Sequence, residues 1–257
     1  MKNISLGLVI LPLLIISCTT ERIDNDDSIG TLDSKVSAKK SEKSAGVGQN
    51  LLPENPANVY DYAGKLHNEL LDVYLAGNYQ YSTILQISEQ VQAIAAENED
   101  VALLNSATNV SALNSATSIP ANLEEIQEII DNPEGKLDNL LANSSMTDAA
   151  KISLYSFMNA TLLWEDEDYE IIYQSIISYE SAVMDSTEFN DEDKRVILTT
   201  SSIARYSIYY EKKRKDEDWD SNVGNRVGAV SGALDNSFIA IIRSLITGIT
   251  INNLVTH

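Results

Sequence analysis

From about Asn58 onward the chain repeats one pattern, in which apolar side chains are separated by steps of three and four residues. Steps of this length put the apolar side chains on one face of an α-helix. Such a helix is stable only when the other helices cover its apolar face. The sequence therefore predicts an all-α fold, a helical bundle of roughly seven to eight helices. The predicted helices cover residues 58–76, 81–97, 120–130, 134–142 and 147–164, continue from 168 and from 190, and end with 223–251.

The last predicted helix, residues 223–251, differs from the others because small residues recur on one face at every fourth position. A face of small side chains lets another backbone approach closely. We expect this helix to lie buried at the centre of the bundle. It is also long enough to span a bilayer, although each of its charges would cost about 2.5 to 3.5 kcal/mol near the bilayer centre. The small-residue face comprises Gly224, Gly228, Gly232, Asn236, Ala240, Ser244 and Gly248.

Residues 1–18 have the order of a bacterial export signal. Lys2 supplies a positive start, residues 4–16 form an apolar run, and the small Ser17 precedes Cys18. The end of this stretch, Ile-Ile-Ser-Cys, is similar to a lipobox, in which the cysteine is acylated and becomes the first residue after cleavage. The run is shorter than the roughly 20 residues that span a bilayer. We predict a lipoprotein signal peptide over 1–17 and lipid on Cys18, the chain's only cysteine. The alternatives are an ordinary cleaved signal peptide and an uncleaved membrane helix.

Residues 18–57 lack apolar periodicity and are rich in Asp, Ser, Lys, Gly and Asn. This composition predicts a disordered tether between Cys18 and a helical head domain over 58–257. The acidic residues that follow Cys18 resemble the signal that sends Bacteroidota lipoproteins to the cell surface. The tripeptide Asp27-Ser28-Ile29 resembles an O-glycosylation motif of that phylum, so Ser28 is a candidate acceptor. The expected location is the outer membrane, with the head facing the periplasm or the cell surface.

The charge and the residue inventory exclude several functions. The chain has a formal net charge of -20, and its field repels nucleic acid. His67 is the only histidine besides the terminal His257, so the sequence has no HExxH motif and no His/Cys set for zinc. The acidic run at 216–220 departs from a calcium loop, because Ser221 and Val227 stand where Gly and Glu are required. We predict no metal, no cofactor and no catalytic residue.

A short motif, YDYAGKLHNE, occupies residues 60–69 at the start of the head. With the lipobox and the Gly/Ala-rich final helix, it resembles a set of uncharacterised Bacteroidota lipoproteins that place an aromatic residue and Asp before a Gly and a His-Asn pair. The resemblance implies no activity, and it singles out Asp61, Gly64, His67 and Asn68. Asp61 and His67 are about 240° apart on a helix, so we expect His67 and Asn68 to satisfy buried polar groups.

These features favour a membrane-anchored lipoprotein whose helical head is an interaction or structural module without catalytic activity. The expected partners are the membrane, through the lipid on Cys18, and a protein or a second copy of the chain. The first alternative is a membrane-acting or self-associating protein that uses helix 223–251. An enzyme of unknown class comes third, because no G-x-S-x-G motif marks a nucleophile.

Overall fold

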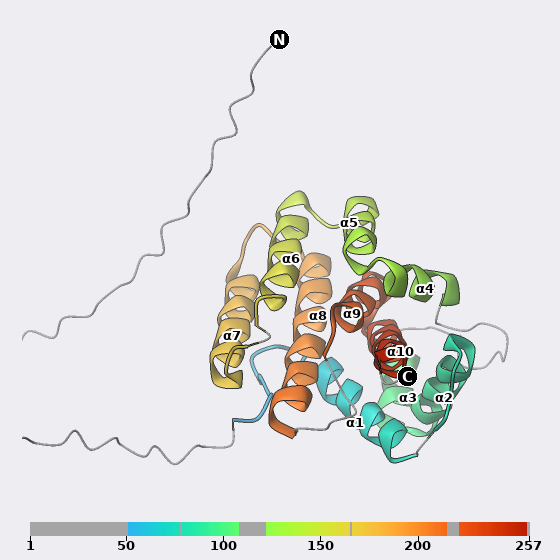
Figure 1. Cartoon of the computed structure of the whole chain (residues 1–257). Coiled ribbons are helices and arrows are strands. Elements are labelled where there is room, and N and C mark those ends of the chain that lie inside the picture. The colour runs from blue at the N-terminus through green and yellow to red at the C-terminus, as the bar shows by residue number, and fades with distance from the viewer. Residues whose placement is uncertain (1–50, 78, 108–121, 165, 215–220, 256–257) are drawn as a thin grey trace, which may run out of the picture. The chain divides into compact units, whose positions relative to one another are not determined.

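The computed structural model describes residues 51–77, 79–107, 122–164, 166–214 and 221–255. The predicted signal peptide, Cys18 and Ser28 lie outside these residues. Within them the chain is all-α, and the predicted fold class is confirmed (Figure 1). The helices are α1 (Tyr62–Ala76), α2 (Ile84–Glu97), α3 (Glu99–Ala107), α4 (Leu123–Asp131), α5 (Pro133–Asn143), α6 (Asp148–Thr161), α7 (Tyr169–Asp185), α8 (Asp191–Tyr209), α9 (Val223–Asp235) and α10 (Ser237–Val255), and a π-helical turn, Tyr210–Arg214, extends α8.

Asparagine side chains begin several of these helices. Asn132, Asn190 and Asn222 each accept a hydrogen bond from the backbone amide three residues further on, at the beginnings of α5, α8 and α9. At α8 the bond is reciprocal, because Asp193 accepts the amide of Asn190 at 3.2 Å. Asp193 also accepts the hydroxyl of Thr147, the cap of α6, at 2.8 Å. The beginnings of α6 and α8 are therefore joined.

The prediction of one continuous helix over 223–251 was wrong, because the segment forms two helices. Asn236 separates them with an extended backbone, φ −170° and ψ 172°. Its side chain accepts the amide of Ile239 at 2.9 Å and so begins α10. Asparagine often ends helices in this way, since its side chain competes for backbone hydrogen bonds.

The two helices fold back on each other as an antiparallel hairpin. Near the turn, Gly232 of α9 lies against the backbone of Ala240, and at the open end Gly224 lies against the side chain of Ile251. Between these points the hydroxyl of Ser244 donates to the backbone carbonyl of Asn225 at 3.0 Å. The small-residue face therefore packs against itself within the chain. Its members Gly228, Ala240, Ser244 and Gly248 are all buried.

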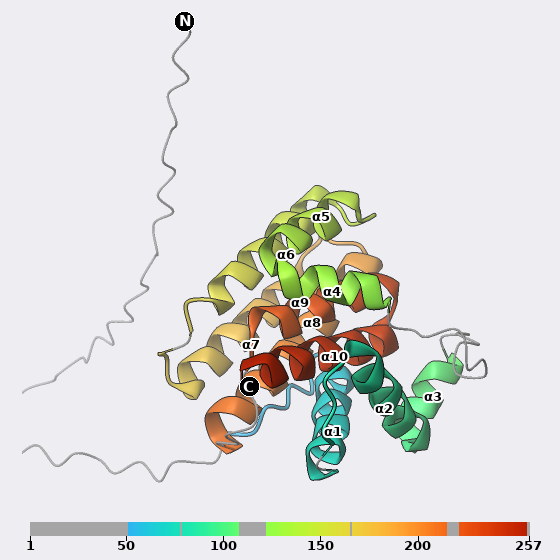
Figure 2. The same cartoon turned by 45° about the vertical axis from the view of Figure 1, so that its right-hand side comes forward.

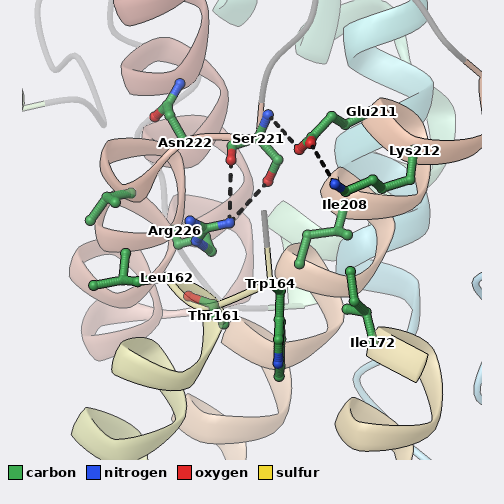
Figure 3. A pocket seen from close by; sticks show the side chains of 11 residues that line it. Thr161, Leu162, Trp164, Ile172, Ile208, Glu211, Lys212, Ser221, Asn222 and Arg226 are labelled. Carbon is green, nitrogen blue, oxygen red and sulfur yellow. Dashed lines mark hydrogen bonds and ion pairs between the residues drawn. The ribbon is translucent and has the colours of Figure 1, made fainter. Parts of the chain in front are cut away.

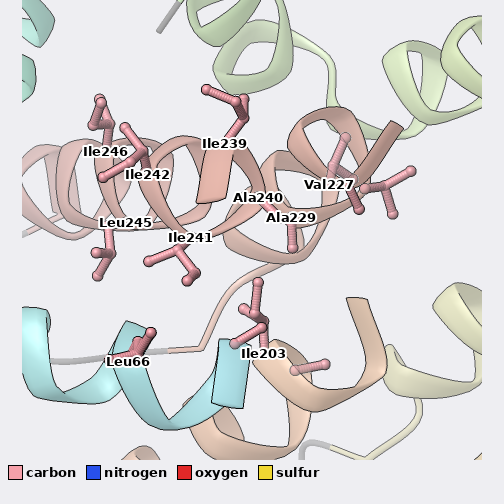
Figure 4. Close-up of a cluster of buried hydrophobic side chains, with 14 of the residues drawn as sticks. Leu66, Ile203, Val227, Ala229, Ile239, Ala240, Ile241, Ile242, Leu245 and Ile246 are labelled. Atoms are coloured by element: carbon pink, nitrogen blue, oxygen red, sulfur yellow. The ribbon is translucent and has the colours of Figure 1, made fainter. Parts of the chain in front are cut away.

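The α9–α10 hairpin is at the centre of the bundle. Helices α1, α2 and α8 contact it, as do α4 and α5 (Figure 1, Figure 2). Figure 4 shows Ile241 and Leu245 of α10 pointing toward Leu66 of α1 and Ile203 of α8. All four side chains are buried. Because full burial of such a side chain contributes about 1.5 to 3 kcal/mol, α10 is the main apolar support for the helices around it.

In the described part of the chain, α10 is the one helix whose length and composition would suffice to cross a membrane. The window Ser237–Leu254 has a mean hydropathy of 1.4, and 72% of it is buried inside the bundle. A core helix of a globular protein has the same properties. The packing against α9, α1 and α2 accounts for the apolar composition of α10.

The hairpin predicts unequal costs for two glycine substitutions. A Cβ at Gly232 would overlap backbone atoms of Ile239 and Ala240, whereas a Cβ at Gly224 would meet the end of the flexible Ile251 side chain. Overpacking against backbone costs about 1 to 3 kcal/mol, and alanine gains about 1 kcal/mol of helix propensity over glycine at either site. We expect Gly232→Ala to lower the free energy of unfolding clearly and Gly224→Ala to change it little. Urea denaturation measures both, and equal losses would contradict the hairpin contact.

Candidate functional site

The motif residues Asp61 and Gly64 join α1 to α8. One carboxylate oxygen of Asp61 binds Nη2 of Arg205 at 2.5 Å, and the other accepts the hydroxyl of Tyr206 at 3.1 Å. The amide of Gly64 donates to Oγ of Ser202 at 3.1 Å. A Cβ at Gly64 would overlap the carbonyl of Ser202, so glycine is what allows α1 and α8 to approach this closely.

The motif residues His67 and Asn68 lie one turn further along α1. The Nδ2 amide of Asn225 lies 3.2 Å from Nε2 of His67, and Nδ1 of His67 lies 3.0 Å from Oδ1 of Asn68. Since an amide nitrogen can only donate, we assign the ring proton to Nδ1, which donates to Asn68. Asn68 in turn donates to the backbone carbonyl of Tyr206 at 2.8 Å. His67 is fully buried, and this burial lowers its pKa to about 4, so the ring is neutral at pH 7.

Glu180 on α7 completes the network that begins at Asp61. Its carboxylate is fully buried and accepts four hydrogen bonds. The donors are Nδ2 of Asn55 at 2.5 Å, Nδ2 of Asn58 at 3.2 Å, Oγ of Ser201 at 2.9 Å and Nη2 of Arg205 at 3.3 Å. Four donors and no acceptor satisfy an ionised carboxylate. Residues 55 and 58 are thereby held against the head just before α1.

Arg205 sits between the two carboxylates of this network. Its side chain is fully buried, and its Nη2 lies 2.5 Å from Asp61 and 3.3 Å from Glu180. Burial by itself disfavours the guanidinium charge, but the charge of Glu180 and the bond to Asp61 outweigh it and raise the pKa of Arg205. The cluster holds α1, α7 and α8 together, because Arg205 forms ion pairs with both carboxylates.

A separate pocket opens beside this network, where the end of α6, the beginning of α7, the end of α8 with its π-helical turn and the beginning of α9 meet (Figure 3). Its volume is about 290 Å³. One part of the wall is apolar, and the rest carries hydroxyl, amide and charged groups. The lining residues are Thr161, Leu162, Trp164, Ile172, Ile208, Glu211, Lys212, Ser221, Asn222, Val223 and Arg226.

Arg226 is the buried cation of this pocket. Its side chain is 6% exposed, and the guanidinium points toward Ser221 (Figure 3). Nη1 donates to the carbonyl and to Oγ of Ser221 over 3.3 and 3.4 Å, while Nε has no hydrogen-bond partner. Burial lowers the pKa of Arg226 to about 10, and the charge of Glu211 offsets part of this effect, so the guanidinium remains charged at pH 7.

The other two charged groups of the pocket pair with each other. Lys212 lies 3.7 Å from Glu211, and Glu211 also accepts the amide of Ser221 at 3.1 Å. Because the charges of this pair cancel, the described lining residues carry one net positive charge, that of Arg226. The site is suited to hold a small anion.

The structure does not bring Asp61 and His67 together, because Asp61 binds Arg205 whereas His67 binds Asn68 and Asn225. In the described ranges no group of three or more His, Cys, Asp or Glu residues could hold a metal ion. The acidic run at 216–220 lies outside those ranges. The four motif residues serve helix docking, and the pocket is the candidate functional site.

Sequence reasoning missed Glu180, Arg205 and Arg226 as members of these sites. A signal was present for Glu180, because it follows Ile176 by four residues and precedes Val183 by three, on the apolar face of α7. Arg226 stands within a segment that is rich in small and apolar residues. A charged residue at such a position is a candidate for a buried functional group.

Comparisons with known proteins give no relative for this chain: no family model, no curated protein and no solved structure matches it. The resemblance to Bacteroidota lipoproteins therefore stays a prediction.

The Arg205 cluster predicts a large and rescuable loss of stability. Arg205→Met leaves the buried Glu180 without its charge partner, and breaking such a pair costs about 3 to 5 kcal/mol. Adding Glu180→Gln removes the orphaned charge and should restore part of the loss. The control is Arg195→Met, which breaks an ion pair to the half-exposed Glu192 and should cost less than about 1 kcal/mol. Chemical denaturation gives the three values, and a loss for Arg205→Met no larger than the control would refute the role of the cluster.

The lowered pKa of His67 predicts a loss of stability in acid. The unfolded chain takes up a proton near pH 6.5 and the folded chain only near pH 4, so the contribution is complete above pH 6.5 and falls as the pH is lowered to about 4. The slope approaches 1.36 kcal/mol per pH unit at most. His67→Gln should flatten the dependence of unfolding free energy on pH in this window. The matched control, His257→Gln, should leave the slope unchanged, and an unchanged slope for His67→Gln would contradict a buried neutral ring.

Proposed function

We propose that this protein is a membrane-anchored lipoprotein of the outer membrane whose helical head is an interaction module without catalytic activity. Lipid on Cys18 anchors the chain, and residues that follow Cys18 serve as the tether. Two acyl chains or more hold a protein far better than one, since each buried methylene contributes about 0.8 kcal/mol. The head is then kept close to the membrane and is free to meet a partner.

One observation supports a binding role best. The polar groups of the motif are committed to other parts of the head, since Asp61 is bound by Arg205 and Asn68 by the carbonyl of Tyr206. Arg226 in the neighbouring pocket differs, because no described carboxylate lies within 4 Å of it and its Nη1 bonds only to the carbonyl and Oγ of Ser221, at 3.3 and 3.4 Å. A pocket that contains a buried guanidinium without an ion pair to a described residue is suited to binding an anion.

Membrane insertion of the final segment is the second candidate, and the apolar composition of α10 favours it. Insertion would require the hairpin to open, because Ala240 and Ser244 of α10 lie against Gly232 and Asn225 of α9. It would also bring Arg243 into the hydrocarbon, away from its partner Asp235 at 2.9 Å. The second candidate therefore carries an energetic cost that the first does not.

Acylation of Cys18 tests the proposed anchor. Produced with its own signal peptide in a Gram-negative host, the wild-type protein should carry diacylglycerol on Cys18 by mass spectrometry and partition into detergent. Cys18→Ser should lose both properties, whereas the control Ser28→Ala should keep both.

The same proteins on dye-loaded liposomes separate the two candidates. The acylated protein should stay on the vesicles and release no dye. An unmodified Cys18 would contradict the anchor, and dye release by the wild type would favour the second candidate over the first.

A further inference from the structure

The pocket around Arg226 contains a buried cation without an ion pair. Among the arginines whose side chains the structure describes, three lie within 4 Å of a carboxylate: Arg195 of Glu192, Arg205 of Asp61, and Arg243 of Asp235. Arg226 has no such neighbour among the described residues. A buried guanidinium is normally paired, because removing the charge from water is costly. The structure therefore holds a buried cation that no described carboxylate pairs within 4 Å, although Glu211 of the same lining favours its charge from a longer distance.

We infer that this pocket binds a small organic monocarboxylate, with the carboxylate on Arg226 and an apolar or aromatic body against Trp164 and the neighbouring aliphatic side chains. The inference deepens the proposed function and rests on it, since it gives the binding module a ligand class. The guanidinium is suited to this role, because its planar N–H groups match the two oxygens of a carboxylate.

The charge of the pocket selects a monoanion. Lys212 and Glu211 pair at 3.7 Å, so among the described lining residues one positive charge, on Arg226, remains. A phosphate dianion would leave a negative charge uncompensated near Glu211. The pocket also lies at the beginning of α9, at Val223, where the helix dipole adds a partial positive charge.

The walls of the pocket select an apolar ligand body. Figure 3 shows the ring of Trp164 standing between the ends of Arg226 and Ile172, with Leu162 and Ile208 on either side. The volume of about 290 Å³ is near the lower end of ligand pockets, which span about 300 to 1,000 Å³. A single ring or a short aliphatic chain fits this space, and a lipid or peptide does not.

Binding of benzoate tests the inference. The acylated full-length protein, in nanodiscs of phosphatidylcholine, is titrated with benzoate by calorimetry, and benzamide serves as the neutral ligand of the same shape. We expect benzoate to bind, benzamide to bind at least tenfold more weakly, and inorganic phosphate to bind more weakly than benzoate. Arg226→Met should weaken benzoate binding at least tenfold, and Arg226→Lys should weaken it less, because lysine keeps the charge and loses the planar pair of donors.

A second variant keeps the test decisive if Arg226→Met fails to fold. Leu162→Trp leaves Arg226 in place and fills the apolar part of the pocket, so it should abolish benzoate binding while the circular dichroism spectrum stays helical. The inference is overturned if benzoate does not bind the wild type, if benzamide binds equally well, or if either variant binds benzoate like the wild type. None of these outcomes would contradict the proposed lipid anchor, because acylation of Cys18 is measured in a separate experiment.

Discussion

The close approach of α9 and α10 is the constraint on which the rest of the structure depends. Gly232 lets the two backbones meet near the turn, and the hairpin then presents apolar side chains such as Ile241 and Leu245 to the helices around it. A bulkier side chain at the turn would separate the two helices and open space in a core that tolerates few voids. The same packing sets the position of Asn225 and Arg226 at the beginning of α9.

Around this hairpin, polar groups decide how the outer helices dock. Arg205 donates to the carboxylates of both Asp61 and Glu180, and the neutral ring of His67 lies between two asparagine side chains. A buried polar network of this kind adds little net stability, but it makes alternative helix registers costly, because each would leave a charge or an amide unsatisfied. The motif at residues 60–69 thus belongs to the architecture of the head.

Arg226 is the exception to this internal pairing, and it stands where four structural elements meet. The Nδ2 amide of its neighbour in sequence, Asn225, contacts His67 and Ser244, whereas the guanidinium of Arg226 lines a pocket with an apolar wall. Position along α9 separates the two roles, since adjacent residues on a helix point about 100° apart. The first turn of α9 therefore contributes one residue to the core and the next residue to the candidate binding pocket.

The sequence by itself determined the helical class, the beginning of a helix at residue 190 and the burial of the final segment, because these depend on the residue pattern along the chain. Only the tertiary structure decided that Asn236 breaks this segment into a hairpin, since an asparagine within an apolar pattern is compatible with a continuous helix until another helix packs against it. Only the tertiary structure brought Glu180 to Arg205 and placed Arg226 beside Trp164, because these contacts join helices that are far apart in the sequence. The propensity of a segment to form a helix depends on neighbouring residues in the sequence, whereas the pairing of buried charges depends on which helices pack together in the core.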